Sequence, residues 1–177
     1  MAESALVVLV PEAENYVSAI REQFDPSARL GVPAHITLLY PFANPAAIGA
    51  STLNALDTVF SAATSFSFHL ATPARFPDAL YLAPEPAPPL IAMIRAITAR
   101  FPSYLPYGGQ FHSVVPHLTV ARGSSQDLAF AEQGLTGMLA SSRIQARCQQ
   151  GVLIENSSGR WKPMQAFPLA TAGRFNR

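Results

Sequence analysis

The sequence repeats a short motif in which a histidine stands two residues before a threonine. The first copy is His35-Ile-Thr37, in the run Val-Pro-Ala-His-Ile-Thr-Leu-Leu, and the second is His117-Leu-Thr119, in the run Val-Pro-His-Leu-Thr-Val-Ala. Chance gives roughly 0.2 such pairs for this number of histidines and threonines, whereas the chain has two. On a strand, residues two apart share a face, so each motif predicts an imidazole beside a hydroxyl.

Two imidazoles and two hydroxyls that converge on one small volume suit a tetrahedral phosphoryl group. Unperturbed imidazole has a pKa of about 6.5, so at neutral pH one ring can be neutral and the other protonated. The neutral ring then takes a proton from a nucleophile while the charged ring delivers one to the leaving oxygen. Threonine hydroxyls donate hydrogen bonds to the non-bridging oxygens. We predict that His35 and His117 are catalytic, that Thr37 and Thr119 bind the phosphate, and that no metal is required.

The remaining histidines and the lone cysteine are not expected to take part in catalysis or to bind a metal. His69 lies on the polar face of an alternating segment, which predicts an exposed residue, and His112 stands at a loop edge five residues before His117. A zinc site needs a third and usually a fourth ligand, and no Asp, Glu or Cys has a matching spacing. Cys148 is the only cysteine, so an intramolecular disulfide is excluded. We expect neither a metal nor a cofactor.

Aromatic residues near the motifs have two interpretations, stacking on a nucleobase or packing in the core. Tyr104, Tyr107 and Phe111 lie in the Pro- and Gly-rich loop before the second motif, where a ring can stack on a base. Loop aromatics also commonly fold back onto the core, and this interpretation is favoured. For Tyr40, which alternation places opposite to His35, and for Trp161, core packing is likewise the expectation.

The segments that must position these residues alternate between strand and helix patterns. Strands are predicted at residues 5–10, 35–40, 65–72, 79–83, 116–121, 143–155 and 161–169, and helices from residue 11 and at 45–62, 90–101 and 126–140. The strands cluster as hairpins more than as isolated crossovers, which favours an α+β fold over a doubly wound parallel sheet. Neither glycine-rich phosphate-loop pattern is present, which disfavours dinucleotide-binding and P-loop folds.

Composition and net charge argue against binding partners that are recognised through a strong overall charge. The 177 residues are 49% hydrophobic with a net charge of +1, from 12 basic and 11 acidic residues. Such a chain fits one domain and generates no strong field for nucleic acid or an anionic membrane, so phosphate binding must be local. The longest apolar runs are too short to span a bilayer, and the first residues lack the basic region of a signal peptide. We expect a cytoplasmic protein.

HITLLYPF and PHLTVARG, the two motifs with their flanking residues, closely resemble the paired motifs of the two-histidine (2H) phosphoesterase superfamily. Its members include the 2′-5′ RNA ligases and the RNA 2′,3′-cyclic phosphodiesterases. The opening apolar strand, the helix after it and the segment FHLATPARFPDALYLAP are all similar to the bacterial branch, so the resemblance extends over most of the chain. It implies one domain over residues 1–177 with two pseudo-symmetric lobes, in which antiparallel sheets face a central groove and helices lie outside. Arg122 matches the family's arginine after the second motif and is implied to contact phosphate.

The resemblance also implies a reaction. Members open a cyclic phosphate with water or act reversibly on 2′-5′ linkages, and by analogy His117 is the base toward water and His35 the acid toward the leaving oxygen. Here the first motif continues into Tyr-Pro-Phe, unlike the better-characterised RNA-acting members. The implied substrate is an RNA 3′ end or a small cyclic nucleotide, handled by a monomer.

Three functions remain open on the sequence alone. The first is a metal-independent phosphoesterase that hydrolyses a 2′,3′-cyclic or 2′-5′ phosphodiester. The second is a module that binds a nucleotide or RNA end in the same groove without turnover, and the third is a protein adaptor with a vestigial pocket. Intact histidine and threonine at both motifs favour the enzyme.

Overall fold

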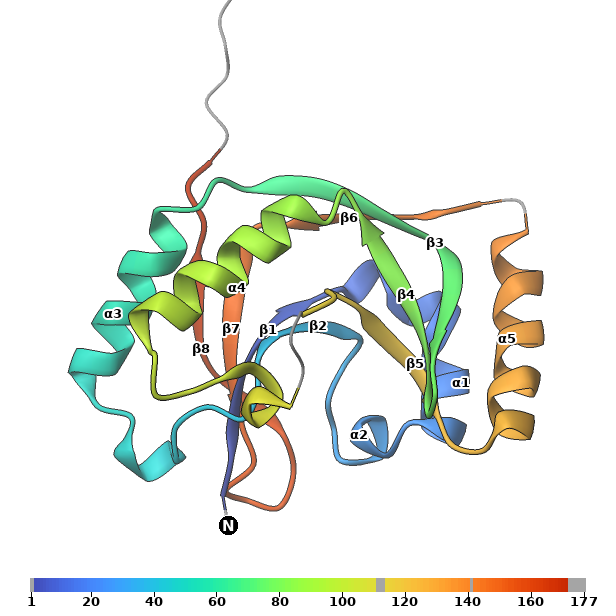
Figure 1. Ribbon diagram of the computed structural model, residues 1–177, viewed down its shortest axis with the longest axis horizontal. Coiled ribbons are helices and arrows are strands. Elements are labelled where there is room, and N and C mark those ends of the chain that lie inside the picture. Colours follow the sequence, from blue (N-terminus) through green and yellow to red (C-terminus); the bar gives the residue numbers. More distant parts are fainter. Residues whose placement is uncertain (1, 111–113, 141, 172–177) are drawn as a thin grey trace, which may run out of the picture.

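The computed structural model describes residues 2–110, 114–140 and 142–171 of the chain. Its strands form one curled sheet in the order β6-β3-β4-β5-β2-β1-β7-β8 (Figure 1). Neighbouring strands of this described sheet pair antiparallel. The strands are β1 Ser4–Leu9, β2 His35–Leu39, β3 Phe66–Phe76, β4 Ala79–Glu85, β5 Leu118–Arg122, β6 Ile144–Cys148, β7 Gln150–Glu155 and β8 Lys162–Pro168.

The sheet has two halves that meet where β5 lies beside β2. Ile36 of β2 and Leu118 of β5 are the partners that join the half β6-β3-β4-β5 to the half β2-β1-β7-β8. This confirms the α+β class with antiparallel strands that the sequence predicts. The two sheets implied by the family resemblance are thus the halves of one continuous sheet.

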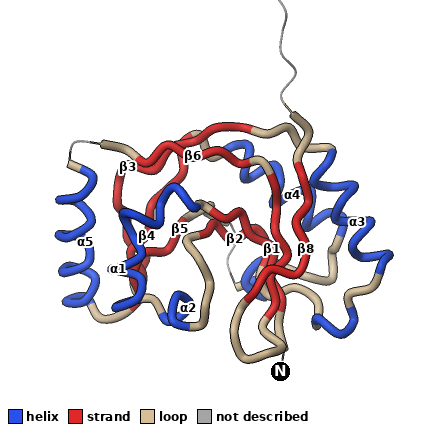
Figure 2. The backbone as a smooth tube through the Cα atoms, turned by 180° about the vertical axis from the view of Figure 1, so that it is seen from behind, coloured by secondary structure: helices blue, strands red, loops and turns tan. Residues whose placement is uncertain are grey.

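The helices tie the halves together. They are η1 Pro11–Ala13, α1 Glu14–Phe24, α2 Pro26–Arg29, η2 Pro45–Ala47, α3 Ala50–Ser61, α4 Pro88–Arg100, η3 Pro106–Gly109 and α5 Ser125–Leu139. Helix α1 follows β1 in the chain but packs on β5 and α5, whereas α4 follows β4 but packs on β2 and α3. Seen from behind, α1 and α5 lie at one end of the sheet and α3 and α4 at the other (Figure 2). Helices α1 and α4 therefore each pack on the junction strand of the opposite half.

The core lies between the sheet and these helices, and it explains the spacing of the motifs. Ile36 and Leu38 of β2 and Leu118 and Val120 of β5 are buried in the main hydrophobic cluster. Both histidines and both threonines, which alternate with these apolar residues, are partly exposed on the other face. Because side chains alternate along a strand, burial of the apolar set fixes the direction of the polar set.

Some predicted elements differ from the observed ones. The predicted helix 45–62 is divided into η2 and α3, because the backbone of Gly49 is extended and caps α3. The predicted strand 143–155 is two strands, β6 and β7, which lie in different halves of the sheet. Strand β3 continues through Pro73, which is tolerated because β6 pairs with β3 only from Phe66 to Leu70.

The helices of the described part of the chain lack the length and continuous apolar character needed to cross a bilayer.

Candidate active site

The junction of the two halves brings the two motifs together. Because Ile36 lies opposite Leu118 in an antiparallel pair, the register places His35 across from Thr119 and Thr37 across from His117. Opposed residues on one face have Cβ atoms about 4.5–5.5 Å apart. All four side chains, together with Arg122, line one pocket of about 290 Å³. The structure therefore brings together the five residues that the sequence singled out.

Each imidazole is held by the same backbone contact. His35 Nδ1 lies 2.8 Å from the carbonyl oxygen of Pro33, and His117 Nδ1 lies 2.7 Å from that of Val115. A carbonyl oxygen only accepts hydrogen bonds, so Nδ1 must carry the hydrogen in both rings. A neutral ring in this arrangement has its free electron pair on Nε2. Both rings can therefore take or donate a proton through Nε2.

Burial sets the charge of the two rings. Burial in the pocket lowers the pKa of His35 to about 4, and it also lowers the pKa of His117. The charges of Arg21 and Arg122 lower the pKa of His35 and His117 respectively, while each backbone carbonyl contact raises it. Without a ligand both rings are thus neutral at pH 7. The sequence expectation of one charged and one neutral ring at neutral pH therefore requires added negative charge, such as that of a phosphate.

A buried ion pair supports the segment that enters the first motif. The side chains of Arg21 and Asp25 are each 2% exposed, and their closest atoms are 2.9 Å apart. Arg21 Nη2 also donates a hydrogen bond to the carbonyl of Val32, and the Glu14 carboxylate accepts one from the backbone N–H of Ala34. These contacts fix the backbone from Val32 to Ala34, next to His35.

Tyr107 completes the wall beside the second motif. A hydrogen bond joins its hydroxyl to the side chain of Thr37, and burial raises its pKa. Its ring stacks on that of His117 at a centroid distance of 6.4 Å. The backbone of Tyr107 has φ +52°, a left-handed conformation that is uncommon for a non-glycine residue. Its N–H donates to the carbonyl of Tyr40, which holds it there.

Arg122 stands at the mouth of the pocket. Its guanidinium Nη1 lies 3.4 Å from the Asp78 carboxylate in the turn between β3 and β4, and both side chains are exposed. Exposed ion pairs contribute little stability, so Asp78 does not prevent Arg122 from binding an anion. Its place on the pocket wall suits the predicted phosphate contact.

Some sequence expectations about other residues need correction. Trp161 and Tyr40 pack on a small buried cluster, as predicted, but both are partly exposed and also line the pocket, which was not predicted. Alternation misplaces Tyr40 because β2 ends at Leu39, one residue before it. Trp161 follows the turn between β7 and β8. It reaches the pocket because these strands join the sheet beside β1, and no pattern in the neighbouring sequence predicts this position. Tyr107 likewise lies in the pocket rather than in the core.

The remaining candidates lie away from the pocket or outside the described residues. His69 is on β3, where its Nε2 is 3.3 Å from the Glu85 carboxylate, and Tyr104 packs on Phe42. His112 and Phe111 lie outside the described residues. Among the residues that are described, no three His, Cys, Asp or Glu side chains gather as metal ligands.

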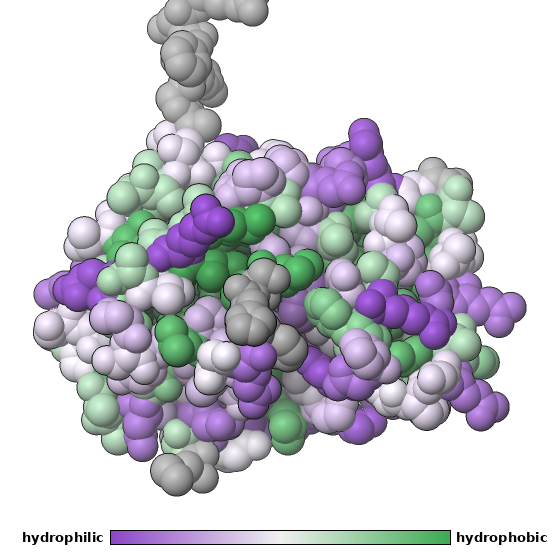
Figure 3. All heavy atoms as spheres, in the orientation of Figure 1, coloured by the Kyte–Doolittle hydropathy of each residue, from purple (hydrophilic) through white to green (hydrophobic). Residues whose placement is uncertain are grey.

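A second pocket of similar size lies between α3 and α4. Its described lining consists of Val59, Ala62, Ala63, Thr64, Phe66, Pro89, Ala92, Met93 and Ala96. Figure 3 shows hydrophobic residues gathered along α4 on this face of the molecule. That lining offers no acid, base or charge, so the pocket at the β2–β5 junction is the candidate site.

Known proteins share this fold. E. coli LigT in complex with 3′-AMP is 16% identical, with a TM-score of 0.60 over 94% of this chain and 97% of that one. The protein TT0787 of Thermus thermophilus is 15% identical, with a TM-score of 0.63 over 97% of this chain and 100% of that one. Comparison with curated proteins finds no match. The family model of the 2′-5′ RNA ligase superfamily matches residues 9–160. At these identities the solved structures show the fold, whereas the family match spans most of the sequence, and by it the chain belongs to the 2′-5′ RNA ligase superfamily.

Proposed function

We propose that the protein is a metal-independent phosphoesterase that hydrolyses a 2′,3′-cyclic or 2′-5′ phosphodiester of an RNA end or a small nucleotide. The observation that carries this proposal is the pair of imidazoles, each fixed through Nδ1, that line one pocket with two threonine hydroxyls. Membership of the superfamily supports the same class of reaction. Structures of E. coli LigT with 3′-AMP, ATP and NADP⁺ add support, because that protein accepts nucleotides in the same fold.

The reaction needs one base and one acid, and both rings can serve. A water oxygen attacks phosphorus while the P–O bond to the 2′ or 3′ oxygen breaks. One histidine takes a proton of the water at Nε2, and the other donates its Nε2 proton to the departing oxygen. One water is thereby added across one P–O bond, and exchange with solvent restores the two rings.

Binding of the substrate supplies the charge that the free site lacks. A phosphodiester anion between the rings favours their protonated forms and so raises both pKa values. Thr37, Thr119 and Arg122 donate hydrogen bonds to the non-bridging oxygens, whose charge is dispersed in the transition state. The proton required by the acid is thus taken up as the substrate binds.

The lowered pKa values of the two rings support an order of roles. The family analogy makes His117 the base and His35 the acid. Burial lowers the pKa of His35 more strongly than that of His117. The ring with the lower pKa is neutral more of the time, which suits a base. We therefore assign His35 as the base and His117 as the acid, the reverse of the analogy.

The test is turnover of 2′,3′-cyclic AMP by the wild-type protein, by His35→Ala, by His117→Ala and by His69→Ala. His69 is the matched control, because it is a partly exposed histidine on β3 that pairs with Glu85. We expect each of the first two variants to lose at least about 100-fold in kcat, His69→Ala to match the wild type, and EDTA to change none of them. Retained turnover in both variants overturns the mechanism. Tight nucleotide binding without any turnover favours the binding module instead.

A further inference from the structure

We propose that the wall formed by Trp161, Tyr40 and the apolar side chains of β1 and β7 is a subsite for a nucleobase attached to the reacting phosphate. The proposal rests on the proposed function, because it takes the space between His35 and His117 as the position of the phosphorus.

The pocket continues beyond the catalytic residues along one half of the sheet. On that side its apolar lining is Ala5, Val7, Val32, Tyr40, Ile154 and Trp161, and the polar residues Asp25 and Ser27 also line the pocket. The aliphatic members form a small buried cluster of their own, on which Tyr40 and Trp161 pack. It lies on the opposite face of β1 from the main core, which contains Leu6 and Val8. This second apolar cluster lies on the pocket face of the sheet, next to the polar side chains of the two motifs. It therefore offers a surface on which a flat aromatic ring of a ligand can pack.

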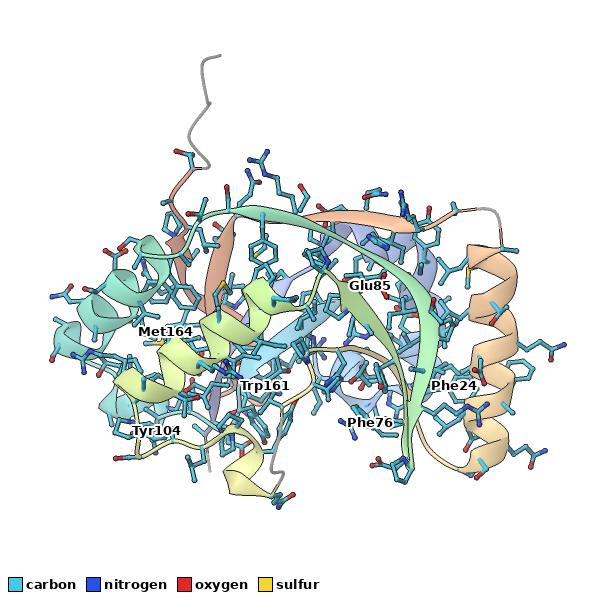
Figure 4. The ribbon with its side chains drawn as sticks, turned by 45° about the horizontal axis from the view of Figure 1, so that its top comes forward. Phe24, Phe76, Glu85, Tyr104, Trp161 and Met164 are labelled. Carbon is cyan, nitrogen blue, oxygen red and sulfur yellow. The ribbon has the colours of Figure 1, made fainter. Side chains whose placement is uncertain are left out.

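The other side of the pocket has different chemistry. Its lining there is His117, Thr119, Arg122 and the hydroxyl-bearing Tyr107. A ligand with a flat aromatic ring at one end and an anionic phosphoryl group at the other matches this polarity. Figure 4 labels Trp161 near the middle of the molecule, on the side of β7 and β8, and Phe76 on β3 of the opposite half. A nucleoside phosphate therefore fits in one orientation, with its base toward Trp161.

The two aromatic rings are held in place before any ligand binds. Trp161 and Tyr40 meet edge to face with centroids 6.2 Å apart, and the Tyr40 hydroxyl donates to the Glu3 carboxylate at 3.1 Å. The backbone N–H of Trp161 donates to the carbonyl of Leu30. Gly31, with φ +95°, lies so close that an added Cβ would be 3.2 Å from the Trp161 carbonyl oxygen. A wall fixed in this way loses little entropy on binding, which favours affinity.

The test uses the fact that Trp161 is the only tryptophan of the chain. Tryptophan fluorescence of the wild-type protein is titrated with 3′-AMP, ribose 3-phosphate and inorganic phosphate. We expect 3′-AMP alone to quench the fluorescence strongly and to bind roughly 10- to 100-fold more tightly than ribose 3-phosphate, as expected for stacking of one base. Equal affinity and equal quenching for the two compounds overturn the subsite. This titration needs no variant and no catalysis.

A second measurement separates the subsite from the proposed function. Turnover of 2′,3′-cyclic AMP is compared with that of glycerol 1,2-cyclic phosphate, which has no base. Trp161→Ala is expected to lower the preference in kcat/KM for the nucleotide by roughly 10- to 100-fold, and Trp161→Phe to keep most of it. Phe130→Ala, which removes an exposed aromatic ring of α5, is the matched control and leaves the preference unchanged. Turnover of both substrates without preference overturns the subsite alone, whereas turnover of neither overturns the phosphoesterase.

Discussion

Ile36 and Leu118 lie opposite each other where β2 meets β5, and their side chains are fully buried in the core. This pairing joins residues 82 positions apart in sequence, and it determines which polar side chains meet on the inner face. A shift of the register by one residue would turn both histidines into the core. The position of the candidate site is therefore a consequence of hydrophobic burial at the junction.

The threonines are expected to act mainly in the transition state. Thr37→Val and Thr119→Val remove one hydroxyl donor each at nearly constant volume, so kcat should fall by about 100-fold for each. Replacement by serine keeps the hydroxyl and should retain most of the activity. Thr98→Val is the control, because Thr98 bonds to the carbonyl of Ile94 within α4. An equal loss for the serine and valine variants would contradict a hydrogen-bonding role.

The pH dependence of kcat/KM should have its maximum on the acidic side of neutrality. The rate should rise from about pH 4 as His35 loses its proton, and it should fall as His117 loses its proton below its ordinary pKa of 6.5. Each lowering results mainly from burial in the pocket. Because kcat reports on the bound state, in which phosphate raises both pKa values, its profile should lie at higher pH. The check is a pair of pH–rate profiles with 2′,3′-cyclic AMP. A kcat/KM maximum above pH 7 would contradict neutral rings in the free protein.

Tyr107 is expected to position Thr37. Tyr107→Phe keeps the ring beside His117 but removes the hydrogen bond to Thr37, so kcat should fall by roughly tenfold, the worth of one neutral hydrogen bond. If the effect passes through Thr37, adding Tyr107→Phe to Thr37→Val should cost little more than Thr37→Val alone. Tyr104→Phe is the control, since Tyr104 packs on Phe42. Fully additive losses in the double variant would show that Tyr107 acts independently of Thr37.

The sequence predicts features that depend on neighbouring residues, whereas features that depend on contacts between distant segments escape it. The motif residues were predictable because strand alternation and burial of their neighbours depend on a few adjacent positions. Trp161 was missed because its place in the pocket depends on where β7 and β8 join the sheet. The separation of β6 from β7 at Gln149 was missed for a related reason. The alternating pattern of β6 leads directly into the apolar run of β7, and only the order of the strands in the sheet divides them. The positive φ of Tyr107 could not be predicted from the sequence, because tyrosine rarely adopts this backbone conformation.

The buried pair of Arg21 and Asp25 should matter for stability. Asp25→Asn leaves the Arg21 charge buried without a counter-charge, so the free energy of unfolding should fall by about 3–5 kcal/mol. Glu132→Gln breaks the partly exposed pair of Arg75 and Glu132 and should cost no more than about 1 kcal/mol. Urea unfolding of both variants and the wild type measures the difference. A loss below about 1 kcal/mol for Asp25→Asn would contradict a structural role for the pair.

The assignment of His35 as base and His117 as acid predicts different responses to the leaving group. A nucleoside 3′-(4-nitrophenyl phosphate) releases 4-nitrophenolate, which leaves without protonation, so removal of the acid should matter little. His117→Ala should then retain turnover within about tenfold of the wild type, whereas His35→Ala should lose about 100-fold or more because the water still requires a base. With 2′,3′-cyclic AMP, whose leaving alkoxide must be protonated, both variants should be impaired. Recovery of His35→Ala in place of His117→Ala would reverse the two roles. Equal loss in both on the aryl ester would show that neither ring protonates the leaving oxygen, because an acid is the only role that a better leaving group can replace.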